Sequence, residues 1–139
     1  MATPLAIPQP RKGNLGRSIS AVVVAILANV VLSLGVDQVF HVIGVYPPWG
    51  APMREPALNL LALGYRLVFG VAAGYIVARL APSAPKRHAT ILGVIATALA
   101  TIGAITTIPL DLGPAWYPIA LAVLSYPTVR LGAALYLRT

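Results

Sequence analysis

Four long apolar stretches alternate with short polar joints along this chain of 139 residues. The stretches cover residues 18–44, 56–79, 87–108 and 115–137. At about 1.5 Å of rise per residue, a helix over each stretch is long enough to cross roughly 30 Å of hydrocarbon. The pattern therefore predicts an all-α integral membrane protein that folds as a four-helix bundle. We expect residues 1–16 to form a flexible tail before a single domain of residues 17–139.

The few charged residues predict which side of the membrane each joint occupies. Charged residues make up only 9% of the chain, and the net charge is +7. Lys and Arg in short joints are retained on the cytoplasmic side. Four spans place most of the basic residues on one side: Arg11, Lys12, Arg17, Arg79, Lys86, Arg87 and Arg138. Both termini are therefore predicted to be cytoplasmic, in a multi-pass protein of the inner (plasma) membrane.

The opposite side carries acidic and aromatic residues. It receives one basic residue, Arg54, and the three acids of the protein: Asp37, Glu55 and Asp111. The aromatic residues expected at this interface are Tyr46, Trp49, Trp116 and Tyr117. Because the positive charges are scattered at span ends and form no basic stripe interleaved with aromatics, we expect anionic inner-leaflet lipids as their partner and no nucleic acid.

The N-terminus has a second interpretation. Arg11 to Arg17 followed by an apolar stretch to Leu34 is similar to a secretory signal, with Ser33 and Gly35 as small residues at a cleavage point. The apolar stretch is long for a signal core, and four retained spans satisfy the charge distribution better. We therefore favour a retained first span.

Each predicted span carries one polar group near the midplane. Arg66 lies ten positions into the second span, about 15 Å from its end. A charge at that depth costs at least about 2.5 kcal/mol, so Arg66 should face protein or water. Asn29, Thr97 and Tyr126 lie at similar depth. We predict that Arg66 hydrogen-bonds Asn29 or Tyr126 and reaches outward to Asp37. A structural pair, an anion or proton site, and simple snorkelling all remain open for Arg66.

Small residues at four-residue spacing predict helix packing. They are Gly70 and Gly74 in the second span and Ala96, Ala100 and Ala104 in the third. Such residues let backbones approach closely in a bilayer, where the hydrophobic effect does not drive helices together. These faces could serve the bundle itself or an external partner, and we favour internal packing.

Spans two and four share a faint similarity. Residues 63–75 align with 124–136, with identical Leu, Tyr, Val, Ala, Ala and Tyr. Both spans run inward, as a duplicated hairpin would require. Spans one and three show no matching agreement, so duplication stays an open alternative.

The sequence indicates no catalytic, metal or cofactor chemistry. It contains no cysteine, and His41 and His88 fall at opposite ends of the predicted bundle. A metal or haem site needs converging ligands. No pairing of nucleophile with base can be drawn from these residues. We therefore expect a protein that is not an enzyme, with no metal and no cofactor.

Several motifs resemble a known group of proteins. The segment 65–82, YRLVFGVAAGYIVARLAP, followed by KRHA at 86–89 and GPAWYPIAL at 113–121, looks like small four-span bacterial inner-membrane proteins of uncharacterised function. The resemblance implies location and topology and carries no activity across. Small multidrug exporters resemble the chain less closely, because they place a coupling Glu inside the first helix, where this chain has no acid before Asp37.

Two functions are compatible with these observations. The first, which we favour, is a noncatalytic accessory or structural membrane component, indicated by the small-residue faces and by the absence of any catalytic constellation; its partner would be another membrane protein or a second copy of the chain. The alternative is a homo-oligomeric transporter or channel for a small or anionic solute, using the midplane polar layer around Arg66.

Overall fold

The computed structural model describes residues 12–138, and this part of the chain is helical between short joints. Its elements are α1 (Lys12–Val42), α2 (Pro56–Leu80), α3 (Pro85–Thr107), the short 3-10 helix η1 (Ile108–Leu110) and α4 (Trp116–Arg138). Four helices are long and apolar enough to cross a membrane, which confirms the prediction of four candidate spans. Most of the predicted tail lies outside the described residues, and 12–16 belong to α1.

Backbone constraints set the start of two helices. Pro56 and Pro85 occupy the first turns of α2 and α3, where the missing N–H of proline costs no helical hydrogen bond. Ala84 lies in the left-handed region at φ 45°, which turns the chain sharply before Pro85. Pro127 lies inside α4, and the helix continues past it to Arg138.

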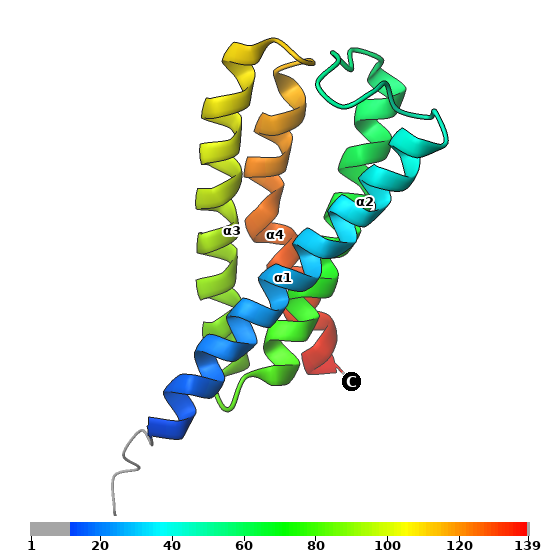
Figure 1. Ribbon diagram of the computed structural model, residues 1–139. Helices are drawn as coiled ribbons and strands as arrows, with labels where there is room; N and C mark the ends of the chain where they lie inside the picture. Colours follow the sequence, from blue (N-terminus) through cyan, green and yellow to red (C-terminus); the bar gives the residue numbers. More distant parts are fainter. Residues whose placement is uncertain (1–11, 139) are drawn as a thin grey trace, which may run out of the picture.

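The bundle has two ends of different chemistry. We call the end with Arg17, Arg79, Lys86 and Arg87 the basic end, and the end with Tyr46, Trp49, Trp116 and Tyr117 the aromatic end. The α2–α3 joint lies at the basic end, and the other two joints lie at the aromatic end (Figure 1). Helices α2 and α4 therefore run in the same direction.

The parallel pair α2 and α4 forms the centre of the fold and has the most extensive contact of any helix pair. Gly74 faces the carbonyl of Val129 so closely that a Cβ there would overlap it, and Gly132 faces the backbone of Val71 in the same way. The rings of Tyr75 and Tyr136 meet edge to face at 5.4 Å. Val71 and Gly132, like the two tyrosines, are equivalent positions in the 63–75 and 124–136 alignment, whereas Gly74 contacts Val129 and not its equivalent, Leu135. The similar segments therefore pack side by side but do not keep the register of the alignment throughout.

The packed core lies in the half of the bundle nearest the basic end. Its members are small or branched apolar residues: Ala21, Ala25, Ala73, Val77, Ala78, Ala89, Leu92, Val129 and Ala133. Toward the aromatic end α1 diverges from α3, and the two helices are far apart at the top of the view (Figure 1). The helices are thus tightly packed at one end and splayed at the other.

Candidate functional site

A cavity of about 630 Å³ occupies the splayed half of the bundle, lined by side chains from all four helices. One wall is a polar stripe on α1, made of Asn29, Ser33, Asp37 and His41. These residues are four apart, a spacing that aligns side chains along one helix face. The cavity therefore has a continuous polar wall inside a mainly apolar protein.

The opposite wall comes from α3 and is built of small residues. Ala96, Ala100, Gly103 and Ala104 line it, with Thr107 at the aromatic end. The alanine stripe predicted to support close helix packing thus lines the cavity, as Gly70 also does, and both Gly70 and Gly74 lie against α4. Small side chains on this wall leave the space that larger residues would fill.

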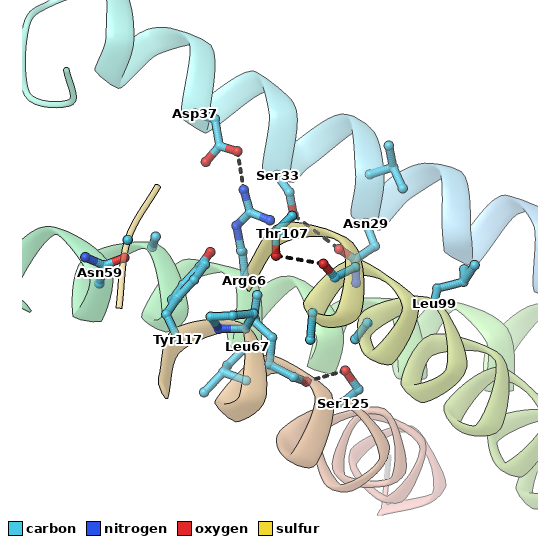
Figure 2. Close-up of a pocket in the computed structure, with 18 of the residues that line it drawn as sticks. Asn29, Ser33, Asp37, Asn59, Arg66, Leu67, Leu99, Thr107, Tyr117 and Ser125 are labelled. Atoms are coloured by element: carbon cyan, nitrogen blue, oxygen red, sulfur yellow. Dashed lines mark hydrogen bonds and ion pairs between the residues drawn. The ribbon is translucent and has the colours of Figure 1, made fainter. Parts of the chain in front are cut away.

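A charged pair links α1 and α2 across the cavity. Nη2 of Arg66 donates to Oδ2 of Asp37 (Figure 2). The hydroxyl of Tyr65 donates to Oδ1 of the same carboxylate. The hydroxyl of Tyr46 donates to that of Tyr65 at 3.0 Å. The Asp37 side chain is only 7% exposed and that of Arg66 30%. Both oxygens of this carboxylate are therefore satisfied by donors, as a buried charge requires.

The other residues of the predicted midplane layer have separate partners. Ser33 donates to Asn29 at 3.2 Å, and Thr97 donates to the carbonyl of Gly93 at 2.8 Å. Tyr126 packs against Gly93, where a Cβ would lie 2.7 Å from its ring. A hydrogen bond from Arg66 to Asn29 or Tyr126 is not found among the described residues. The reason is geometric: the guanidinium extends toward the aromatic end to meet Asp37.

One atom of Arg66 remains without a partner. Its Nε is buried and makes no hydrogen bond with any described residue. An orphaned buried donor costs about 1–3 kcal/mol, more for a charged group. Arg66 also lines the cavity, but Nε is enclosed by protein, so a molecule in that space meets the other nitrogens of the guanidinium.

Polar contacts fasten the bundle at the basic end. Nε2 of His88 lies 2.8 Å from the hydroxyl of Ser18, which joins α3 to α1. Arg130 on α4 donates to Thr90 on α3 at 2.8 Å. These contacts hold the helices together at the basic end, and the helices diverge from there toward the aromatic end.

Different contacts fasten the joints at the aromatic end. The backbone N–H of Met53 donates to the carbonyl of Leu112 at 2.6 Å. Beside it, Arg54 forms an exposed ion pair with Asp111 at 3.1 Å. The hydrogen bond from Arg54 lowers the pKa of Asp111 below its usual value. In the first joint, burial raises the pKa of Tyr46.

The two histidines remain apart. Nδ1 of His41 lies 2.5 Å from the carbonyl of Pro47, and its ring stacks on Trp49 with centroids 3.9 Å apart. Within the part of the chain that the structure describes, no group of His, Asp and Glu side chains could hold a metal ion.

Sequence reasoning singled out Asp37 and Arg66 but missed several neighbours. Tyr65, Tyr46 and Tyr117 were treated as interfacial or unremarked residues, yet the first two complete the network around Asp37. The four-residue spacing from Asn29 to His41 was a usable signal for a polar helix face. It could not show that this face borders a cavity.

Comparison of the chain with protein-family models, with curated proteins and with solved structures gives no significant match. The resemblance to small four-span bacterial proteins therefore stays a prediction from the quoted motifs. The structure itself defines the class: a helical protein with four helices able to span a membrane and a cavity among them.

Proposed function

We propose that this is a noncatalytic multi-pass membrane protein whose cavity binds a small molecule. The observation that carries the proposal is the cavity of about 630 Å³ with the Asp37–Arg66 pair in its wall. Its volume falls in the range of roughly 300–1,000 Å³ typical of small-ligand pockets. An ionised pair inside the membrane region is costly, and such residues generally mark functional sites.

The noncatalytic part of the proposal rests on how the charged groups are engaged. Asp37 accepts one hydrogen bond on each oxygen, from Arg66 and from Tyr65, and these bonds hold α1 to α2. A general base needs an acceptor free to take a proton from a substrate. Binding without chemistry suits an accessory component. We propose that it lies in a bacterial inner membrane with both termini cytoplasmic, a proposal supported by the charge distribution of the joints and by the sequence resemblance.

A second candidate, favoured by one observation, is a transporter for a small solute. Besides its lateral side, the cavity reaches the joints at the aromatic end, where Trp49 and Gly113 line it, while the alanine-rich core closes the half nearest the basic end. A site that is open on one side and sealed on the other is what alternating access requires of one of its two states. Four helices enclose little space, so this candidate includes a homo-oligomer.

The test is native mass spectrometry of the protein released from its own membrane, with co-purifying molecules identified. Ala100→Leu places a larger side chain in the cavity, and Ala98→Leu, an exposed position on the same helix that does not line the cavity, is the matched control. We expect wild type and Ala98→Leu to retain a small molecule that Ala100→Leu loses. Equal retention by all three variants, or by none, would contradict binding in the cavity.

The same spectra separate the two candidates. A reproducible larger protein partner supports the accessory role. A homo-oligomer without partners supports transport, and solute flux with Arg66→Gln is then the next measurement.

A further inference from the structure

The mouth of the cavity opens sideways between α1 and α3. Val30 on α1 and Leu99 on α3 both line the cavity and are 46% and 55% exposed. Val30 lies twelve residues from the end of α1, and Leu99 eight from the end of α3, or about 18 and 12 Å. Both positions lie within the roughly 30 Å of hydrocarbon. An apolar rim at this depth would face lipid chains, and α1 and α3 diverge from one another toward the aromatic end (Figure 1).

Two groups in the cavity wall offer hydrogen-bond donors to it. One is the guanidinium of Arg66, which has N–H groups besides the one bound to Asp37. The other is the hydroxyl of Tyr117, which lines the cavity, interacts electrostatically with Arg66 and makes no hydrogen bond with a described residue. Figure 2 shows the Tyr117 side chain beside that of Arg66. A single carbonyl oxygen has two lone pairs and could accept from both.

The charge balance selects the kind of acceptor. Asp37 already neutralises Arg66 at hydrogen-bond distance. A free anion bound here would leave a net negative charge beside Asp37 in a poorly solvated space, which is strongly unfavourable. A neutral carbonyl satisfies the donors without adding charge.

The depth of the donors indicates the source of that carbonyl. Tyr117 is the second residue of α4, at the interfacial level of the aromatic end. The ester groups of glycerolipids lie at this boundary between headgroups and hydrocarbon. The remainder of the cavity extends from there toward Ala25 and Leu92, alongside the apolar rim. This shape fits an acyl chain that extends from its ester at the interface toward the bilayer centre.

We propose that the cavity holds one acyl chain of a glycerolipid from the leaflet at the aromatic end, with the ester carbonyl bound by Arg66 and Tyr117. This inference rests on the proposed function, since it names the class of molecule that the cavity binds. The lipid enters laterally between α1 and α3.

The experiment compares two lipids that differ only at the proposed contact. The protein is placed in nanodiscs of equal parts diester phosphatidylcholine and its diether analogue, which lacks the carbonyls. Native mass spectrometry after release from the nanodisc measures the ratio of the two lipids that stay bound to the protein. Because each of the two hydrogen bonds contributes about 0.5–1.5 kcal/mol, wild type should retain more of the diester than of the diether, by about five- to 150-fold.

Tyr117→Phe removes one donor and no packing, and Tyr126→Phe makes the same change at a tyrosine of α4 that does not line the cavity. We expect the diester preference to fall by about two- to tenfold in Tyr117→Phe, where the bond from Arg66 remains, and to persist in Tyr126→Phe, with equal thermal unfolding of both. A ratio of one in wild type, or equal loss in both variants, would overturn the lipid assignment. A second copy of the protein bound at the mouth in place of lipid would also overturn the lipid assignment.

Failure of the two proposals can be told apart. If Ala100→Leu expels a bound molecule but wild type shows no diester preference, the cavity binds something other than an ester lipid. If Ala100→Leu and wild type retain the same molecules, binding in the cavity itself is refuted.

Discussion

A methyl group added at Gly74 would force α2 and α4 apart. The Cβ of an alanine there would overlap the carbonyl oxygen of Val129. That oxygen belongs to the backbone of α4, so it cannot rotate away as a side chain could. The helices must separate, and the opposite contact, where Gly132 approaches the backbone of Val71, must open with them.

The magnitude follows from two terms. Overpacking a tight contact costs about 1–3 kcal/mol. Alanine also favours a helix over glycine by about 1 kcal/mol. Gly64→Ala, in the same helix, gains the second term without the first, because a Cβ there has no atom within 4 Å. The difference between the two variants therefore isolates the packing term, and Gly74→Ala should be less stable than Gly64→Ala by about 1–3 kcal/mol.

The assay is reversible unfolding in mixed micelles with increasing SDS, followed by near-ultraviolet circular dichroism. The double variant Gly74→Ala/Gly132→Ala should lose less than the sum of the single losses, because the first methyl group already separates the helices. Equal stability of Gly74→Ala and Gly64→Ala would refute the close parallel contact of α2 with α4.

Two further predictions concern ion pairs. Arg66→Leu alone and Asp37→Leu alone should each lose about 3–5 kcal/mol of stability in the same assay, because each leaves a buried charge unpaired. The double variant should recover much of that loss. Independent, additive losses would contradict the pairing. At the surface, Arg54 lowers the pKa of Asp111. The ion pair therefore stabilises the folded protein fully above a pH of about 3.9, and this stabilisation is lost as the pH falls through the lowered pKa of Asp111. Stability measured from pH 7 to pH 2 should show this step in wild type and not in Asp111→Asn; a step of the same size in both would assign it to other groups.

Much of the candidate site was visible as separate fragments in the sequence. A lone Arg66 near the midplane needs a partner, and Asp37 is the only acid inside a predicted span. That argument led to the pair that links α1 to α2. The tyrosines around it could not be placed in the same way, because an aromatic residue near a span end is stable at the interface without any specific partner.

Sequence alone determined the four spans, because whether a segment can cross a bilayer depends on the length and apolarity of that segment itself. It did not determine which helices are neighbours. Lipid tails are as apolar as leucine, so the apolar content of a helix does not encode its partner. Only the tertiary structure set α4 against α2 through Gly74 and Gly132, and turned the alanine stripe of α3 toward an open cavity. Those choices depend on how backbones fit in three dimensions, and they decide where a ligand can bind.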